Sequence, residues 1–523
     1  MRKIKKIPPS WVQLFCLLTV GVSSCVQYYH PPKIDKPIPE AWKNENEAVG
    51  KTPELPKATY EEMSYWWEIF NDEQLSKLEE EALKQSPTLQ LQIARLQEAR
   101  GLFITVRSDL FPHLDFAGSA ERQHFSPTSQ ISTSQATSGQ TPGSSAPANP
   151  VPQAPSSNPT VPSPQISRPP PPKNSNASRS GFTQSFVQAV AVVSYELDFW
   201  GKFYQSTQSA LNHVKGSLED VRTSYLLLTI NIAQAYYQVR ADDANIQVLE
   251  RVVKEYRELL TLNKELFASG IVSDLNVLQA EINLSQNEQT LEKAKNERAL
   301  DEDLLATLVG VPASSFTLAQ VEEKSFRPEI PKIPEGMPAD LLKKRPDIRQ
   351  SEFAVESARL DVGVAKTAFF PTIGISGTAG YQGNKFSNLF KWKNRVWSAT
   401  AALLQPIFDG GYNYGNYLQA KAKYQQAVAI FLNTVIQSYQ DVEDSLNTID
   451  ASQIRNRISE AQLKSASEFS RLTSLQYESG IIDYLTAINA ELNALQAESN
   501  TIQTKQEQVI ATLSLIKSLG GSW

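Results

Sequence analysis

Cysteine and histidine are scarce in this chain of 523 residues, which contains two cysteines and four histidines. Two cysteines cannot form a disulfide framework. The sequence also contains no P-loop, HExxH or GxSxG motif that would carry catalysis. We therefore predict no enzymatic activity and no catalytic residues. We also predict no metal site, because the four histidines lack metal-ligand spacing: His30, His113, His124 and His213.

Long apolar runs and an excess of positive charge are also missing. No apolar run reaches about 18 residues, which excludes a bundle of transmembrane helices. The chain has 50 basic and 56 acidic residues and a formal net charge of −6, so nucleic acid is not an expected partner. With 41% hydrophobic and 20% charged residues, the average composition is that of a water-soluble globular protein.

The N-terminus has the pattern of a secretion signal. Residues 1–24 combine four basic residues among the first six with an apolar stretch from Trp11 to Val22, which is too short to span a bilayer. The small residues directly before Cys25, Val-Ser-Ser, resemble a bacterial lipobox. We predict cleavage after residue 24 and a covalent lipid on Cys25, which would anchor the chain to a membrane without spanning it. An ordinary secretory signal with an incidental cysteine is the alternative.

The chain contains two copies of one unit. The segments Phe-Ala-Ser-Gly-Ile-Val around Gly270 and Tyr-Glu-Ser-Gly-Ile-Ile around Gly480 are 210 residues apart. The Phe-Pro pairs that end at Pro112 and Pro371 are instead 259 residues apart. The offset therefore falls by 49 residues between Pro112 and Gly270, which locates an insertion in the first copy. We predict a tandem repeat, with the first copy in residues 71–320 and the second in residues 321–523.

The insertion is rich in proline and poor in charge. Residues 126–172 hold 13 of the 31 prolines, and residues 126–167 hold no charged residue. Such a segment cannot bury enough apolar surface to offset the entropy lost on ordering. We predict a disordered loop over about residues 126–180, between the two strands of the first copy.

Each copy contains two segments in which apolar and polar residues alternate, at about residues 111–125 and 182–199 and at about residues 370–384 and 394–408. This alternation predicts β-strands with one apolar and one polar face. It fits the strands of a membrane barrel and a soluble two-sheet domain equally well. Four strands are too few to close a barrel, since the smallest have about eight, so a membrane sheet would require several chains to pool their strands.

Long helices follow the strands in each copy. Between residues 211 and 267 a stripe with 3/4 spacing is apolar at 15 of 17 positions over 57 residues, about 85 Å at 1.5 Å per residue. The second copy shows the stripe less clearly, between residues 428 and 449. Gly270 and Gly480 suit the left-handed position that follows a helix end, and the residues three positions later can cap the next helix. The sequence therefore predicts two long antiparallel hairpins with tight tips.

Four motifs resemble those of one protein family. The stretch Tyr-Trp-Trp-Glu-Ile-Phe-Asn-Asp-Glu-Gln-Leu begins at Tyr65, and Met-Pro-Ala-Asp-Leu-Leu-Lys-Lys-Arg-Pro-Asp begins at Met337. The others are Val-Gly-Val-Ala-Lys-Thr-Ala-Phe-Phe-Pro from Val362 and Gln-Pro-Ile-Phe-Asp-Gly-Gly from Gln405. Together with the two glycine tips, these motifs resemble the TolC-like outer-membrane efflux lipoproteins of the OprM/NodT branch.

The resemblance implies a mixed, mainly helical fold and a homotrimer. Its twelve pooled strands would form one outer-membrane β-barrel, and its antiparallel coiled-coil helices would form a periplasmic tunnel. Residues 25–70 would form a lipidated N-terminal segment and part of an equatorial domain, to which the C-terminal end of the chain also contributes. Such a trimer would resolve the shortage of strands in a single chain.

The resemblance also implies passive conduction of drugs, toxic compounds, metals or metabolites through the outer membrane. In such systems an inner-membrane pump, commonly of the resistance-nodulation-division type, supplies the energy. A periplasmic adaptor, also called a membrane fusion protein, joins the pump to the channel. Two alternatives stay open, a type I secretion duct for polypeptides and a structural periplasmic coiled-coil lipoprotein.

Hairpin tips close the periplasmic end of the tunnel in this family, often with rings of carboxylates. At the corresponding positions this sequence has Thr486 and Asn489, with Asn276 and Gln279 as their repeat counterparts, so it departs from relatives that carry aspartate there. Asp483 is favoured as a helix cap over a gate residue. The predicted adaptor contact comprises Gly270, Ser273, Gly480 and Asp483, and the predicted gate comprises Asp274, Asn276, Gln279, Thr486 and Asn489.

Overall fold

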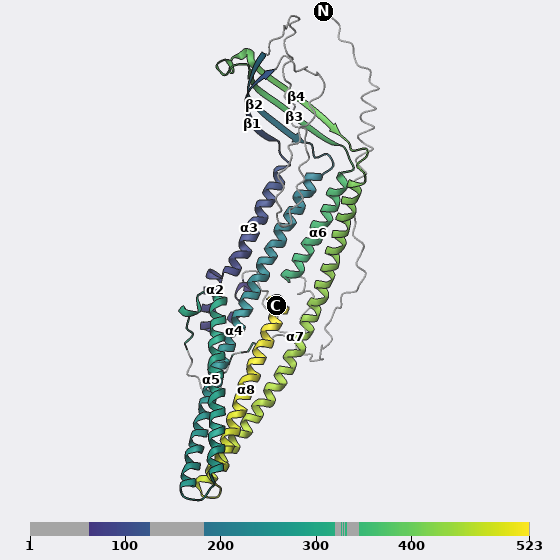
Figure 1. The fold of residues 1–523 in the computed structure, drawn as a ribbon. Helices are drawn as coiled ribbons and strands as arrows, with labels where there is room; N and C mark the ends of the chain where they lie inside the picture. Colours follow the sequence, from purple (N-terminus) through teal and green to yellow (C-terminus); the bar gives the residue numbers. More distant parts are fainter. Residues whose placement is uncertain are drawn as a thin grey trace, which may run out of the picture. The chain divides into compact units, whose positions relative to one another are not determined.

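The computed structural model describes residues 62–125, 182–319 and 345–521, with four single residues between the last two ranges (Figure 1). The predicted signal peptide, the predicted lipid attachment at Cys25 and the proline-rich insertion lie outside the described residues.

The described chain is mainly helical and contains four antiparallel strands, which confirms the expected fold class. None of its helices is both long enough and apolar enough to cross a membrane. Before the first copy lies η1 (Glu62–Phe70). In the first copy the elements are α2 (Glu73–Gln85), α3 (Pro87–Ser108), β1 (His113–Phe125), β2 (Phe182–Glu196), α4 (Lys202–Ala268), α5 (Asp274–Val309) and η2 (Ala313–Ser315). In the second copy they are α6 (Pro346–Thr367), β3 (Thr372–Gly383), η4 (Phe386–Asn388), η5 (Trp392–Asn394), β4 (Arg395–Leu404), α7 (Tyr412–Glu478) and α8 (Tyr484–Ser518).

The chain forms two compact units, and each unit draws on both copies of the repeat. The strand unit includes Leu102–Ser209 and Arg359–Ala422, which carry all four strands. The helical unit includes Ala210–Ala358 and Lys423–Trp523, together with the helices that precede Leu102.

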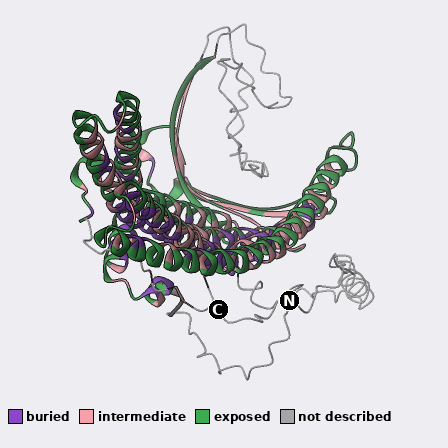
Figure 2. Cartoon of the chain, turned by 90° about the horizontal axis from the view of Figure 1, so that it is seen from below, coloured by how far each residue is buried: buried purple, intermediate pink, exposed green. Residues whose placement is uncertain are grey.

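The strand unit is built on one sheet with the order β1-β2-β3-β4, curved as Figure 2 shows. Its register aligns one series of apolar residues from each of the four strands on the same face, while Val190 and Val396 lie on the opposite face. One row across the sheet joins Leu114, Val193, Gly377 and Ala399, and the next joins Phe116, Ala191, Ala379 and Trp397. The other face carries polar rows such as His113, Ser194, Ser376 and Thr400. The predicted apolar face therefore extends across the whole sheet.

All four strands are shorter at the helix-proximal end than the alternation suggested. After β2 and β4, helix starts take up the flanking residues. β2 ends at Glu196, and the Asp198 carboxylate accepts the backbone N–H groups of Phe203 and Tyr204 at the start of α4. β4 ends at Leu404, two residues before Pro406, which has no N–H to donate to a ladder. The Asp409 carboxylate then accepts the N–H groups of Gly411 and Asn413 at the start of α7. Both aspartates therefore stabilise helix N-termini.

The core of the helical unit surrounds the middle of α4, where Ile230, Ile232 and Val239 are fully buried. The aromatic residues of η1 pack against it, and the Trp66 indole donates to the Thr229 hydroxyl at 3.0 Å. Asp72 caps α2 through the backbone N–H of Gln74 and also accepts the hydroxyl of Tyr236 on α4 at 2.8 Å. The motif at residues 65–75 therefore attaches the start of the described chain to the long helix of the first copy.

The buried seam of α7 is made of small residues at seven-residue spacing: Ser438, Ser445, Ser452 and Ser459. The Ser459 hydroxyl lies 3.0 Å from the hydroxyl of Thr501 on α8. Small side chains let two helices approach closely, so the seam continues after the apolar stripe ends near residue 449. This explains why the stripe is less clear in the second copy.

In each copy, the end of the hairpin packs against the start of the helix that precedes the strands. The end of α5 meets the start of α3, and the end of α8 meets the start of α6. We call these two contacts the joints. After α5, Gly310 has φ +93°, and a Cβ there would lie 3.0 Å from the Gln85 carbonyl oxygen and 3.2 Å from Pro87 Cδ. After α8, Gly520 has φ +76°, and a Cβ there would lie 3.2 Å from Arg345 Cα. Only glycine satisfies both the left-handed backbone and the lack of space.

Candidate functional site

The two hairpin tips have the same backbone geometry. Gly270 and Gly480 have φ values of +71° and +72°. The N–H of Gly270 bonds to the carbonyl of Phe267, and the N–H of the next residue, Ile271, bonds to the carbonyl of Leu266. The second tip repeats this pattern. Both hairpins thus turn through a Schellman arrangement, with each glycine in the predicted left-handed position.

Side-chain caps start the returning helices. The Ser273 hydroxyl accepts the N–H of Leu275 at 3.2 Å, and the Asp483 carboxylate accepts the N–H of Thr486 at 2.7 Å. Hydrogen bonds from Thr486 lower the pKa of Asp483. Asp274 lies in the first turn of α5 and does not cap it, because Ser273 does. The preference for Asp483 as a helix cap is consistent with this geometry.

The predicted gate residues all lie on exposed surface of the single chain. Asp274, Asn276 and Gln279 occupy the start of α5, where the Gln279 amide donates to Asn283 at 3.0 Å. Thr486 and Asn489 occupy the start of α8. The predicted adaptor residues Gly270, Ser273, Gly480 and Asp483 are also exposed.

In each hairpin, a glutamate at the equivalent repeat position links the two helices of that hairpin. Glu281 on α5 pairs with Lys264 on α4 at 3.0 Å. Glu491 on α8 accepts the hydroxyl of Ser470 on α7 at 2.5 Å. The partners differ although the glutamates are equivalent, so the two hairpins have diverged in how their helices are held together.

A second set of contacts joins the two hairpins to each other, between α4 and α8. The Tyr484 hydroxyl donates to Glu258 at 3.1 Å, Arg251 pairs with Glu498 at 2.6 Å, and the Ser499 hydroxyl donates to Asn245 at 2.7 Å. Residue numbers rise on one helix as they fall on the other, so the helices run antiparallel along this seam. We call it the inter-hairpin seam.

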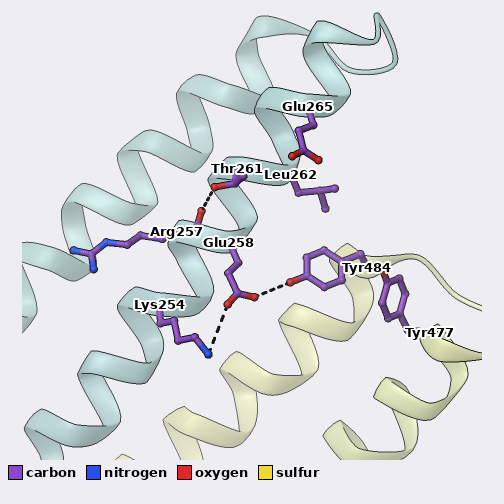
Figure 3. A pocket seen from close by; sticks show the side chains of 8 residues that line it. All are labelled: Lys254, Arg257, Glu258, Thr261, Leu262, Glu265, Tyr477 and Tyr484. Carbon is purple, nitrogen blue, oxygen red and sulfur yellow. Dashed lines mark hydrogen bonds and ion pairs between the residues drawn. The ribbon is translucent and has the colours of Figure 1, made fainter.

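The contact nearest the tips lies beside an open pocket of about 410 Å³ (Figure 3). Glu258 is bonded to Tyr484 and also pairs with Lys254 at 3.7 Å. The ring of Tyr477 lies 5.1 Å from that of Tyr484. The pKa of Tyr484 is raised to about 12, mainly because the hydroxyl is partly buried and secondly because it bonds to Glu258. The hydroxyl therefore remains a donor at neutral pH. The remaining lining residues are Arg257, Thr261, Leu262 and Glu265.

Sequence reasoning missed Glu258 and Tyr484, although comparison of the two copies contains a signal. The repeat counterpart of Glu258 is Glu468, which pairs with Arg471 on its own helix at 2.7 Å. The position equivalent to Arg471 in the first copy is Thr261, which cannot form that pair. Glu258 is therefore available to bond across to the other hairpin.

The described residues contain no group of three or more His, Cys, Asp or Glu placed to hold a metal ion.

The family model described as "Outer membrane efflux protein" matches residues 172–311 and 337–521, more than half of the chain. The toluene efflux pump outer membrane protein TtgC of Pseudomonas putida is 25% identical over 506 residues, which cover 96% of this chain and 93% of the relative. The pyoverdine export outer membrane protein OpmQ of Pseudomonas aeruginosa is 26% identical over 461 residues, which cover 88% and 87%. The crystal structure of the Campylobacter jejuni CmeC outer membrane channel has the same fold, with a TM-score of 0.74 at 22% identity and 94% of each chain covered. This chain belongs to the outer membrane efflux protein family, whose members are transport proteins and not enzymes.

Proposed function

We propose that three copies of this outer-membrane efflux protein close one twelve-stranded barrel and conduct small molecules passively to the cell exterior. The observation that carries this proposal is the sheet itself. It has a continuous apolar face and two edge strands, β1 and β4. The outer side of each edge strand pairs with no described strand. An apolar face suits lipid, but an open edge in a bilayer would leave backbone groups without hydrogen bonds. Pairing of β1 with β4 of the next copy satisfies both edges.

The dimensions of the strands support this arrangement. The edge strands β1 and β4 have 13 and 10 residues. About 9–11 residues suffice for a tilted strand to cross the hydrocarbon core. Exposed aromatic residues lie beyond both ends of the strands, as in the interfacial girdles of membrane barrels. At the end next to the helices they include Phe199, Phe408 and Tyr412, and at the opposite end Phe386, Phe390 and Trp392.

We further propose that the hairpin tips form the periplasmic end of the tunnel, where a periplasmic adaptor joins the channel to an inner-membrane pump, commonly of the resistance-nodulation-division type. The exposure of both tips and their equal geometry support a docking role. The covalent lipid on Cys25 would add an anchor in the outer membrane. Residues 71–320 and 321–523 would act as two similar units, so a trimer would present six hairpins.

The relatives support a channel that does not itself select its cargo. Toluene and pyoverdine, named for the two relatives above, have little chemistry in common. We therefore assign the choice of substrate to the pump and adaptor. A role in small-molecule efflux fits these relatives better than secretion of polypeptides.

Cysteine crosslinking tests the trimer. Ser119→Cys on β1 is combined in turn with Val396→Cys, Ser398→Cys and Thr400→Cys on β4, which lie on the same face. We expect at least one pair to give covalent oligomers no larger than a trimer. Gln188→Cys replaces Ser119→Cys as the control, because Gln188 is the register partner of Ser119 on the central strand β2 and cannot reach another copy. A monomer in every lane would overturn the barrel and favour a structural periplasmic lipoprotein.

Single-channel recording tests conduction and the predicted gate together. Reconstituted wild-type protein should give a stable conductance in planar bilayers. Asp274→Ala and Asp483→Ala should reduce cation selectivity if the tip carboxylates contribute to the gate. Wild-type conductance and selectivity in both variants would remove these carboxylates from the gate and leave the packing of the tips to close it.

A further inference from the structure

We propose that the loop between β3 and β4, residues 384–394, together with Arg395 at the start of β4, binds the phosphate-bearing headgroups of lipids in the outer leaflet of the membrane. This inference rests on the proposed barrel, which places the loop at the end of the sheet away from the helices (Figure 1). We call this segment the cationic loop.

The cationic loop carries charge of one sign only. Lys385, Lys391, Lys393 and Arg395 are all exposed. Residues 372–404, which comprise the loop and both of its strands, contain no aspartate or glutamate. None of the four cations forms an ion pair within the part of the chain that the structure describes. Four positive charges are therefore exposed without a counter-charge from any residue that the structure describes.

The position of Arg395 directs this charge toward lipid. Arg395 is the register partner of Tyr381, so it shares the apolar face with Tyr381 and Trp397 and lies at the end of that face. Its guanidinium lies 4.2 Å from the centre of the Trp392 ring. A cation at the rim of a lipid-facing surface extends to the headgroup region, while its stem and the adjacent ring stay in the apolar layer.

Exposed aromatic side chains accompany the cations of the loop. The Phe390 ring lies 5.6 Å from the ring of Tyr381, and Phe386 and Trp392 are each 73% exposed. Large exposed aromatic residues interleaved with lysines are costly in water and stable at a membrane interface, where rings meet the acyl boundary and ammonium groups meet phosphates.

The loop is held in shape, so these groups are presented together. Leu389 is buried, and its N–H bonds to the carbonyl of Phe386. The Asn394 amide donates to the carbonyl of Asn388 at 2.6 Å, and the Asn394 N–H bonds to the carbonyl of Lys391. Binding therefore does not need to order the loop first.

The opposite end of the sheet lacks this excess of positive charge. There Lys202 pairs with Glu196 at 3.3 Å, and the carboxylates of Asp198 and Asp409 accept helix N–H groups. On β1, at the same end as the cationic loop, Glu121 and Arg122 carry opposite charges. The cation excess is thus confined to one end, which favours an anionic lipid surface on that side of the barrel only.

Lipid analysis of the reconstituted protein tests the proposal. Full-length protein is placed in nanodiscs of phosphatidylcholine containing a minor fraction of lipid A, a phosphorylated glycolipid, and the lipid retained on the purified trimer is counted by mass spectrometry. We expect enrichment of lipid A over the bulk fraction. The variant Lys385→Gln/Lys391→Gln/Lys393→Gln should lose at least about fivefold of that enrichment, the effect of a single lysine near an anionic surface. Enrichment should also fall as salt is raised.

The matched control is Lys77→Gln/Lys84→Gln/Lys293→Gln, which removes the same charge from exposed lysines of the helical unit. The control should retain wild-type enrichment. Equal lipid A retention in the loop variant and in wild type, or equal loss in the control, would overturn the proposal. Channel conductance of the same samples separates the two hypotheses. A conducting trimer without lipid preference rejects the lipid site alone, and a wild-type sample that never conducts rejects the proposed function.

Discussion

The hydroxyl of Tyr484 donates a hydrogen bond to a carboxylate oxygen of Glu258 at 3.1 Å, and this bond joins two helical hairpins whose bonded residues are 226 positions apart in the sequence. It is the contact of the inter-hairpin seam nearest to the tips. Any movement that separates the hairpins must break it.

Tyr484→Phe should make the tips easier to separate. The substitution removes only the hydroxyl, and because Glu258 is half-exposed the bond contributes at most about 1 kcal/mol, or roughly a fivefold change in the open population. We expect a matching rise in open probability in planar bilayers. Tyr477→Phe is the control, since the Tyr477 hydroxyl has no hydrogen bond to a described residue. An equal response in both variants would show that the ring environment, and not the bond, controls opening.

The two tip aspartates should differ in how they affect helix starts. Asp483→Ala removes the cap on the N–H of Thr486, whereas Asp274→Ala leaves the Ser273 cap in place. Amide hydrogen exchange in the first turn of α8 should therefore become several-fold faster in the first variant. Exchange in the first turn of α5 should change little in the second. The same acceleration in both hairpins would contradict the assignment of separate caps.

Gly380→Ala should prevent correct formation of the sheet. A Cβ on Gly380 would lie 2.6 Å from Val190 Cα and would also collide with the Ala189 carbonyl oxygen. Since these are backbone atoms of the neighbouring strand, relief requires β2 and β3 to separate, at a cost of about 1–3 kcal/mol or more. We expect a large loss of trimer that resists SDS without heating. Gly374→Ala on the same strand has no atom within 4 Å and should assemble normally.

Glu79 should make stability fall as pH rises. Its side chain is fully buried on α2, neither carboxylate oxygen has a partner among the described residues, and burial raises its pKa to about 10 from a normal value of 4.5. The folded protein therefore keeps the proton between pH 4.5 and 10, while the unfolded chain releases it. Ionisation favours the unfolded state in this window, by up to about 1.4 kcal/mol per pH unit.

Thermal unfolding at pH 5, 7 and 9 measures this dependence. Glu79→Gln cannot ionise, so its melting temperature relative to wild type should rise steadily with pH. Glu80→Gln is the control at a neighbouring exposed position and should run parallel to wild type at every pH. A constant difference between Glu79→Gln and wild type across the three pH values would mean that Glu79 is already ionised in the folded protein.

The parts of the fold that follow a regular period were predictable. Alternation from Leu114 onward and from Ile373 onward gave strands with a shared apolar face, and the glycines at 270 and 480 gave the tips. The seam of α7 was not predictable in the same way. Serines such as Ser445 and Ser452 are polar, and in sequence they resemble solvated positions, although small side chains are what a close helix contact requires.

The contacts between hairpins lay beyond local patterns. Glu258 pairs with Tyr484 because two helices from different copies meet, and no spacing rule relates those positions. Asp198 and Asp409 show a related limit, because an aspartate after a strand is equally consistent with a strand end and with a helix start. Only the observed bonds distinguish the two roles.

The joints at Gly310 and Gly520 limit how far the two copies can diverge. The hairpins have already exchanged ion pairs for hydrogen bonds, as Glu281 and Glu491 show, without losing their common geometry. At each joint, by contrast, any side chain would meet either Gln85 and Pro87 or Arg345 and Pro346. The two copies can therefore vary along their helices but must each keep a glycine at the joint. Mutational scanning should find that neither glycine tolerates substitution, because each has a positive φ and no space for a Cβ.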